Sequence, residues 1–430
     1  MKRKIIDQLI LWKKSNNGKP ILLTGAKGVG KTYLAYDFAK AFFEGIFYIN
    51  FERDSSSKSL FSTSDPSKIK EQVLNYFSIT METLPKSRIL ILDEINFAPD
   101  VIECMNLLQK SRIFPYIVAI SSNPLQSNEK AKFHSISVYP LEFDEFLRAT
   151  GYEWYIETIM NHFESNQKIP EIVHTELLTL HELYLQIGGM PGMINEYQSL
   201  SSVVNIAEQH SLLISSYHDY ILKDNQESDA LKMNQVFDSL VLQLMKENKK
   251  FQYKLIRKGT THAMYKDAIQ CLADRNYVIM SHKIANELLQ ASDNTFLASD
   301  WSNNTSNSNF KLYLPDTGML SSKMMEEKVD FSDEDRKKAL LENFVAQSLQ
   351  AKGYQLAFWE SDSMAKIDFI INKNQELIPI EIHSSDNTRS KSISVFKQKY
   401  EFPYAVKISS KNFDYSNQIK YVPYYAVFCL

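Results

Sequence analysis

Residues 25–32 read Gly-Ala-Lys-Gly-Val-Gly-Lys-Thr, and this stretch constrains the fold more than any other part of the chain. It has the G-x-x-x-x-G-K-[ST] pattern of the Walker A phosphate-binding loop. Glycines let such a loop wrap around a triphosphate with its backbone N–H groups pointing inward. An apolar run precedes it at 20–24, and apolar residues at helical spacing follow it over 33–43. This strand, loop and helix order predicts a nucleotide-binding site rather than a glycine-rich turn without a ligand.

The last residues of the loop have distinct predicted roles. Lys31 is expected to reach the β- and γ-phosphates and to assist catalysis, and the Thr32 hydroxyl is expected to ligate Mg²⁺. The helix that follows would direct its positive N-terminal end at the same phosphates. The predicted nucleotide-binding residues of this region are Gly25, Ala26, Lys27, Gly28, Val29, Gly30, Lys31, Thr32 and Tyr33.

A second motif lies at residues 88–95, where an apolar strand ends in two carboxylates as in the Walker B pattern. The carboxyl ends of strands in an open α/β sheet are where such folds hold ligands. Asp93 is therefore predicted to bind Mg²⁺, directly or through water, and Glu94 to orient and deprotonate the attacking water. An acidic strand end without a role is the alternative, which the upstream loop disfavours.

Residues 116–123 form another apolar run that ends in polar side chains. Asn123, or a neighbouring serine, is a candidate sensor of the γ-phosphate, and a polar turn cap is an equally good interpretation. Together with strands predicted near 45–52 and 135–141, these runs give about five strands with intervening helices. The pattern predicts an α/β fold with a three-layer αβα P-loop NTPase core.

Composition limits the class of protein. The chain has 430 residues, enough for about two to four domains. A net charge of −3 argues against a wholly basic nucleic-acid coat. The cysteines (Cys104, Cys271 and Cys429) are scattered without metal spacing, which favours a reducing, cytoplasmic location. No stretch approaches the length of a membrane span, so no membrane partner is expected.

Two further phrases complete a family resemblance. Residues 139–147 read Tyr-Pro-Leu-Glu-Phe-Asp-Glu-Phe-Leu, and residues 188–191 read Gly-Gly-Met-Pro. With Walker A and Leu92-Asp93-Glu94-Ile95, they resemble bacterial and archaeal AAA-type ATPases, which are similar to the signal-transducing STAND NTPases. The resemblance implies ATP and Mg²⁺ as cofactors, a helical lid over 151–210 and a restriction-endonuclease-like domain at the C-terminus.

The resemblance also implies roles for two residues outside the Walker motifs. Pro191 corresponds to a proline that packs near the adenine, although a helix-ending turn explains the same sequence. Relatives usually carry an arginine shortly before the Pro-Leu-x-Phe phrase, as a candidate finger for the γ-phosphate. Lys132 stands in this region here, and a point charge copies a planar guanidinium poorly, so slow turnover is expected.

The region 211–325 resembles a winged-helix module. Helix, turn, helix and hairpin follow one another over 251–283. Its basic side chains are candidates for contact with DNA phosphates, and docking to a protein or within the chain is the alternative that the neighbouring acidic residues favour. These basic residues are Arg257, Lys258, Lys266, Arg275 and Lys283.

The last hundred residues carry a second set of acidic residues. Glu342, Asp368 and Glu381 follow the PD-(D/E)xK nuclease pattern, in which carboxylates bind Mg²⁺ and a lysine helps to activate water. His383 occupies the lysine position and does not supply a fixed positive charge. Lys391 or Lys397 is a candidate replacement, and a domain that keeps the nuclease fold but cuts poorly or not at all is favoured.

These patterns predict four parts: an AAA-type ATPase core (1–150), a lid (151–210), a winged-helix region (211–325) and a nuclease-like domain (330–430). The leading prediction is an ATPase that hydrolyses ATP slowly and acts as a conformational switch. The alternatives are an ATP-regulated, metal-dependent DNA nuclease and a non-enzymatic module that binds DNA or protein. The predicted partners are ATP and, through the winged helix or the C-terminal domain, DNA or a protein; an oligomer is left open.

Overall fold

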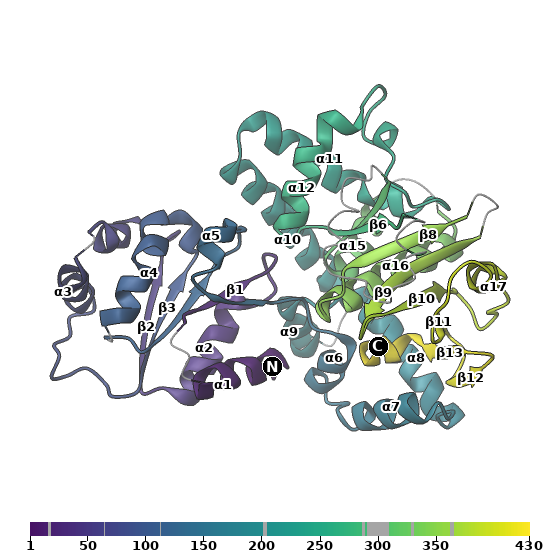
Figure 1. The fold of residues 1–430 in the computed structure, drawn as a ribbon, viewed down its shortest axis with the longest axis horizontal. Helices are drawn as coiled ribbons and strands as arrows, with labels where there is room; N and C mark the ends of the chain where they lie inside the picture. Colours follow the sequence, from purple (N-terminus) through teal and green to yellow (C-terminus); the bar gives the residue numbers. More distant parts are fainter. Residues whose placement is uncertain are drawn as a thin grey trace. The chain divides into compact units, whose positions relative to one another are not determined.

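The chain folds into two compact units, Met1–Tyr139 and Pro140–Leu430, and each is described by itself. Figure 1 shows the elements of both units in a computed structural model. The structure describes residues 1–15, 19–63, 65–111, 113–200, 204–285, 289, 309–327, 331–361 and 365–430. Residues 290–308, part of the predicted winged-helix region, lie outside the described residues.

The first unit is built on a five-stranded sheet in the order β2-β3-β4-β1-β5, and every pairing in it is parallel. The strands are β1 (Ile21–Thr24), β2 (Gly45–Asn50), β3 (Arg88–Asp93), β4 (Tyr116–Ile120) and β5 (His134–Ser137). Strands buried on both faces are typical of parallel sheets and explain the apolar runs in the sequence. The predicted α/β class with a parallel five-stranded sheet is confirmed.

Helices pack on both faces of this sheet. They are α1 (Ile5–Ser15), α2 (Lys31–Phe42), α3 (Pro66–Tyr76), α4 (Pro99–Ser111) and α5 (Ser127–Lys130), with short 3₁₀ helices at Ser55–Phe61 and Ile95–Phe97. Leu90 and Leu92 face a core that includes Val73 of α3 and Met105 of α4. On α1, Trp12 packs on Phe38 of α2 and on Tyr116 at the start of β4. Side chains alternate between the two faces of each strand, so this gives three layers.

The second unit begins with helices. They are α6 (Phe143–Ala149), α7 (Trp154–Ser165), α8 (Glu171–Ile187), α9 (Pro191–Leu200), α10 (Val204–Asp224), α11 (Glu227–Leu244), α12 (His262–Asp274), α15 (Thr317–Glu326), α16 (Asp333–Ala351) and α17 (Ser392–Lys397). Short 3₁₀ helices lie at Tyr253–Leu255 and Tyr424–Cys429. Within the described ranges, no helix of either unit is long and apolar enough to cross a membrane.

A mixed eight-stranded sheet in the order β12-β13-β11-β10-β9-β8-β6-β7 completes this unit. Its strands are β6 (Ile279–Lys283), β7 (Phe310–Tyr313), β8 (Leu356–Glu360), β9 (Lys366–Lys373), β10 (Glu376–Ile382), β11 (Ala405–Ser409), β12 (Asp414–Ser416) and β13 (Ile419–Pro423). Strand β6 pairs antiparallel with β7 and parallel with β8. The hairpin expected for the winged helix therefore extends the C-terminal sheet, and the two predicted regions share one sheet in the green part of Figure 1.

The division between the units falls after Tyr139 rather than after residue 150, because α6 packs on helices of the second unit. Phe143 and Phe146 of α6 both contact the ring of Tyr184 on α8. The Tyr184 hydroxyl donates to the carbonyl of Leu141 at 2.6 Å. The residues after the boundary are thus part of the helical core of the second unit.

Two glycine-containing phrases of the sequence meet in that core. The backbone N–H of Gly189 donates to the buried carboxylate of Asp316 at 2.6 Å. Gly188 has a φ of 78°, and a Cβ there would lie 2.1 Å from Oδ1 of Asp316. A Cβ at Gly318 would lie 2.5 Å from the carbonyl oxygen of Ile187. The glycines are therefore required by close backbone packing at this point, whatever else this segment does.

Candidate functional site

The loop between β1 and α2 adopts a backbone that only glycine accommodates easily. Gly25, Gly28 and Gly30 have φ values of 141°, 87° and 88°. A Cβ at Gly25 would lie 2.1 Å from the carbonyl oxygen of Val138, the residue that follows β5. The positive φ values explain the three glycines, and the close approach of Val138 is a second reason for glycine at Gly25.

Lys31 is the first residue of α2, and its ammonium lies inside the loop. Its Nζ donates to the carbonyl oxygens of Gly25 at 2.8 Å and Ala26 at 3.0 Å. Burial lowers the pKa of Lys31 to about 8, although the charges on Glu94 and Asp93 oppose this shift. A desolvated ammonium whose hydrogen bonds go to loop carbonyls is well suited to pair with an anionic phosphate.

Asp93 ends β3 and is surrounded by uncharged donors. One carboxylate oxygen, Oδ2, accepts hydrogen bonds from the Thr32 hydroxyl (3.0 Å), the Tyr48 hydroxyl (2.7 Å) and the Asn50 amide (3.1 Å). The other oxygen, Oδ1, is buried and has no hydrogen-bond partner among the described residues. A buried carboxylate oxygen that accepts no hydrogen bond from these residues is suited to contact a cation.

Glu94 follows Asp93 in a left-handed backbone conformation, with a φ of 54°. Its carboxylate accepts from the Ser122 hydroxyl at 2.6 Å and from the Ser122 N–H at 3.2 Å. Burial raises the pKa of Glu94, and Lys31 and Ser122 limit that rise. A carboxylate with a raised pKa, held in one orientation, is suited to accept a proton from water. The strained backbone at this position is consistent with a functional site.

The sensor prediction is sharpened by the segment after β4. Ser122 contacts Glu94, and the sensor role of Asn123 stays a prediction. The Asn123 carbonyl accepts from the Ser121 hydroxyl at 2.7 Å, which closes the turn. Ser122 was included only as a neighbouring alternative in the sequence prediction, since adjacent polar residues at a strand end cannot be ranked without the strand register.

Among the described residues of the first unit, neither Tyr33 nor Lys132 is hydrogen-bonded to Asp93 or Glu94. Tyr33 lies on α2 and is 59% exposed. Lys132 pairs with the Glu103 carboxylate at 3.0 Å and lies 3.4 Å from the carbonyl of Ile102, so its ammonium is held by α4. Pro191 begins α9 in the second unit. Their proposed contacts with nucleotide stay predictions.

The residues at the loop fit a magnesium ion. Mg²⁺ takes oxygen ligands and is usually held by one or two protein groups together with substrate phosphates. Thr32 supplies a hydroxyl and Asp93 a buried carboxylate whose Oδ1 is not engaged by described residues. This pair is the donor set that the sequence predicted for the metal.

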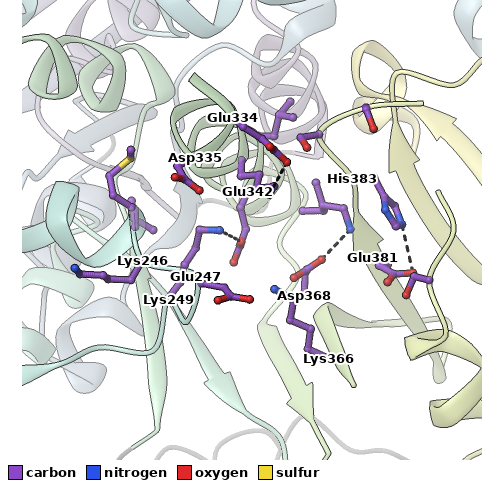
Figure 2. A pocket seen from close by; sticks show the side chains of 18 of the residues that line it. Lys246, Glu247, Lys249, Glu334, Asp335, Glu342, Lys366, Asp368, Glu381 and His383 are labelled. Atoms are coloured by element: carbon purple, nitrogen blue, oxygen red, sulfur yellow. Dashed lines mark hydrogen bonds and ion pairs between the residues drawn. The ribbon is translucent and has the colours of Figure 1, made fainter. Parts of the chain in front are cut away.

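The second predicted site lies in a polar pocket of about 390 Å³ in the second unit. Glu342 on α16, Asp368 on β9, Glu381 on β10 and His383 just after β10 all line it, as Figure 2 shows. The four residues that the sequence suggests as a possible nuclease site thus line one pocket. Within the described ranges, however, no group of three or more His, Cys, Asp and Glu side chains is arranged to hold a metal ion.

Lysines neutralise the first carboxylate of this pocket. Glu342 is paired with Lys249 at 2.8 Å and Lys311 at 2.9 Å, and it accepts from the Tyr313 hydroxyl at 2.7 Å. Figure 2 shows Lys249 directed at Glu342. Although burial alone would raise it, the two lysines hold the pKa of Glu342 well below its ordinary value. Glu342 is thus ionised and already supplied with cations.

Glu381 also lies beside basic side chains. Lys407 of β11 lies 3.3 Å from its Oε2, and His383 lies 3.4 Å from the same oxygen. Asp368 accepts instead from the backbone N–H of Ile382 at 2.8 Å, and burial, followed by the charge on Glu342, raises its pKa. The pKa of Asp368 is therefore shifted in the opposite direction from those of Glu342 and Glu381.

The lysine paired with Glu381 is not one that the sequence suggested. Lys397 donates to Gln418, and Lys391 caps the start of α17, whereas Lys407 lies beside Glu381. Strand β11 pairs in parallel with β10, and Lys407 is opposite Glu381 in the register. This cross-strand neighbour cannot be read from spacing along the chain, and the role suggested for Lys391 or Lys397 stays a prediction.

One basic residue of the predicted winged helix is also corrected. Arg275 is buried and donates to Asn225 at 3.2 Å, so it is not on a surface that could meet phosphates. The sequence alone does not show that Arg275 is buried, because its partner Asn225 is 50 residues away along the chain. The contact of the other basic residues with DNA stays a prediction.

Comparisons with known proteins now assign the first of these sites to a class, that of P-loop ATPases. A family model described as an AAA domain matches residues 17–147, which contain both Walker motifs. This match supports an AAA-type domain that binds and hydrolyses ATP. Two models described as domains of unknown function, DUF8612 and DUF4143, match residues 179–329 and 337–427. A search of the curated proteins found no match.

Several solved structures resemble the chain at low identity. A Walker-type ATPase of Pyrococcus abyssi is 14% identical, with a TM-score of 0.41, over 75% of this chain and 95% of that chain. An ORC2 protein of Aeropyrum pernix is 11% identical, with a TM-score of 0.32, over 65% and 86%. A STAND protein of Pyrococcus horikoshii with a tetratricopeptide repeat sensor is 14% identical, with a TM-score of 0.28, over 82% and 45%. The assignment of the ATPase domain rests on the family model and not on these structures.

Proposed function

We propose that the chain is a magnesium-dependent ATPase in which Lys31, Thr32, Asp93 and Glu94 carry the reaction. Lys31 would leave the loop carbonyls to bind the β- and γ-phosphates, and the loop N–H groups would hold the phosphate chain. Mg²⁺, held by Thr32 and Asp93, would neutralise charge on the phosphates. Glu94, oriented by Ser122, would take a proton from the attacking water.

The observation that carries this proposal is the state of the two Walker B carboxylates. Asp93 keeps a buried oxygen without a partner in the described structure, and Glu94 is fixed by two hydrogen bonds with a raised pKa. These are the properties that a metal ligand and a general base require, and they occur next to a buried lysine. A site that only bound phosphate would need neither carboxylate.

The experiment is ATP hydrolysis and binding by two variants and a control. Lys31→Ala should abolish nucleotide binding, whereas Glu94→Gln should retain binding and lose turnover. Lys40→Ala removes an exposed lysine from the same helix and should change neither quantity. Normal hydrolysis by both Lys31→Ala and Glu94→Gln would show that the roles are wrongly assigned.

We further propose that the ATPase works as a conformational switch with slow turnover. The support is that Lys132, the candidate for the arginine finger, is paired with Glu103. In this proposal nucleotide would close the helical lid, with Pro191 near the adenine, and the change would reach the C-terminal sheet. Protease protection of residues 151–210 by a non-hydrolysable ATP analogue tests this step, and an unchanged cleavage pattern would contradict it.

A second candidate function is an ATP-regulated, metal-dependent DNA nuclease. It is favoured by one observation: Glu342, Asp368, Glu381 and His383 line one pocket, with Lys407 beside Glu381. In this case Lys407 would supply the positive charge that His383 lacks. The lysine pairs around Glu342 favour a domain that keeps the nuclease-like arrangement without cutting.

Cleavage of supercoiled plasmid and single-stranded DNA separates these two functions. The protein is incubated with Mg²⁺ or Mn²⁺, with and without ATP, alongside Asp368→Ala. Cleavage that disappears in Asp368→Ala would establish the nuclease. ATP turnover without cleavage under any condition would establish the switch ATPase. Contact of the winged-helix region with DNA or with a protein, and the cytoplasmic location, remain predictions.

A further inference from the structure

Strand β2 supplies two side chains to the metal site that the proposed reaction does not use. Tyr48 and Asn50 both donate to Oδ2 of Asp93, at 2.7 Å and 3.1 Å. Asn50 also donates to the Tyr48 hydroxyl at 3.2 Å, so the two donors are linked to each other. Thr32 is the third donor to the same oxygen. Every hydrogen bond that the described residues make to this carboxylate side chain therefore ends on Oδ2, and Oδ1 has none.

The amide of Asn50 is itself held in a single orientation. Its Oδ1 accepts the backbone N–H groups of Glu52 at 3.1 Å and Arg53 at 2.9 Å, in the turn that follows β2. The amide nitrogen must therefore face Asp93. Because β2 and β3 pair in parallel with Asn50 opposite Asp93, the donor is placed by strand register rather than by a mobile loop.

Both donors are uncharged, which matters for a metal ligand. A lysine in either position would neutralise the carboxylate, as lysines do for Glu342 in the second unit. A phenol and an amide fix one oxygen while leaving the negative charge in place for a cation.

We propose that Tyr48 and Asn50 are positioning residues for the metal of the ATPase site. They hold Oδ2 of Asp93, so that Oδ1 is the oxygen available to Mg²⁺ or to one of its waters. The inference rests on the proposed ATPase function and deepens it by assigning how this chain orients its metal ligand. Partners that orient metal ligands typically change metal affinity by about 10- to 100-fold when removed.

The test is Mn²⁺ binding to the full chain saturated with a non-hydrolysable ATP analogue, measured by electron paramagnetic resonance. Tyr48→Phe removes only the hydroxyl, and Asn50→Ser removes the donor while leaving an acceptor for the turn. Both should weaken Mn²⁺ binding about 10-fold. Tyr36 is a matched control, because its ring centroid lies 5.2 Å from that of Tyr48. Tyr36→Phe also removes a hydroxyl and should leave Mn²⁺ affinity unchanged.

Nucleotide affinity is measured in parallel without metal, in EDTA. We expect this metal-free nucleotide affinity to be unchanged in Tyr48→Phe and Asn50→Ser, because the two substitutions act on the metal ligand. Wild-type Mn²⁺ affinity in both variants would overturn the inference while leaving the ATPase proposal intact. An equal loss of affinity in EDTA would show a general effect on the loop and would also overturn it. A wild-type chain that binds no nucleotide would instead overturn the proposed function itself.

Discussion

The two acidic sites of this chain use the same kind of residue in opposite ways. At the end of β3, Asp93 is surrounded by three uncharged donors that all bond to one oxygen. In the second unit, Glu342 is enclosed by Lys249 and Lys311. Uncharged donors orient a carboxylate and preserve its charge, whereas lysines satisfy that charge internally. The first arrangement is ready for a metal ion, and the second resembles a buried ion pair that stabilises the fold.

The largest expected effect separates the two sites by function. Asp93→Asn should lower ATP hydrolysis about 1000-fold, because a ligand that lets the metal neutralise phosphate charge contributes several kcal/mol to the barrier. Asp368→Asn, the matched change in the second unit, should leave hydrolysis unchanged. Steady-state turnover at saturating Mg²⁺ and ATP checks both. A large loss in Asp368→Asn would show that the pocket of the second unit takes part in ATP turnover.

For the free energy of unfolding, in contrast to ATP hydrolysis, a change at the pocket of the second unit should have a large effect. Glu342→Gln leaves Lys249 and Lys311 buried without a counter-charge and should destabilise the chain by about 3 kcal/mol. Glu334→Gln changes an exposed pair with Lys338 and should cost less than about 1 kcal/mol. Urea unfolding monitored separately for each unit measures both effects.

The ion pairs of Glu342 also predict that the stability of the chain depends on pH. The pKa of Glu342 is lowered in the folded chain, so its stabilisation is fully present above the ordinary glutamate value of about 4.3 and is lost as the pH falls further. Wild type should therefore lose stability on acidification more steeply than Glu342→Gln. Parallel stability curves for the two proteins would contradict an ionised Glu342.

Lys31 gives a smaller effect in the alkaline range. Its pKa is about 8 in the free protein, and bound phosphates should raise it, so nucleotide binding above this pH takes up a proton. Affinity should then fall by up to about tenfold per pH unit above pH 8. Equilibrium titrations with a fluorescent ATP analogue between pH 7.5 and 9.5 measure this slope. A Lys31→Arg variant that still binds should give a flat profile, and a flat wild-type profile would contradict the lowered pKa.

The smallest expected effect concerns Ser122. Ser122→Ala removes the hydroxyl that donates to Glu94 at 2.6 Å but keeps the backbone donor. We expect kcat to fall about tenfold, at the low end for the loss of one hydrogen bond to a charged group because the backbone donor remains, with little change in nucleotide affinity. Ser122→Thr should retain most of the activity. An unchanged kcat in Ser122→Ala would show that the backbone N–H alone orients Glu94.

Local pattern was sufficient to predict the first site but not its supporting residues. The loop and the two carboxylates are contiguous motifs, so spacing predicts Lys31, Thr32 and Asp93 directly. Tyr48 and Asn50 lie on another strand, and their role depends on the parallel register that puts Asn50 opposite Asp93. The sequence indicates this role only through the alternate positions of Tyr48 and Asn50, which are polar residues in an otherwise apolar strand.

The site in the second unit was harder to predict, because its side chains also depend on contacts between distant elements. Glu342, Asp368 and Glu381 were expected together, but the lysines that determine their charge come from other elements. Lys407 reaches Glu381 across the register of two strands, and Lys311 lies on a hairpin that was assigned to a separate module. Pairings between distant strands determine these contacts, and spacing along the chain does not encode them.

The central claim is that the Walker loop, and not the pocket of the second unit, is the metal–nucleotide site of this chain. The most direct measurement counts Mn²⁺ bound in the presence and absence of a non-hydrolysable ATP analogue, in wild type, Asp93→Asn and Asp368→Asn. The account predicts a site that forms with nucleotide, is lost in Asp93→Asn and is kept in Asp368→Asn. Nucleotide-independent Mn²⁺ binding that is lost in Asp368→Asn and kept in Asp93→Asn would contradict it.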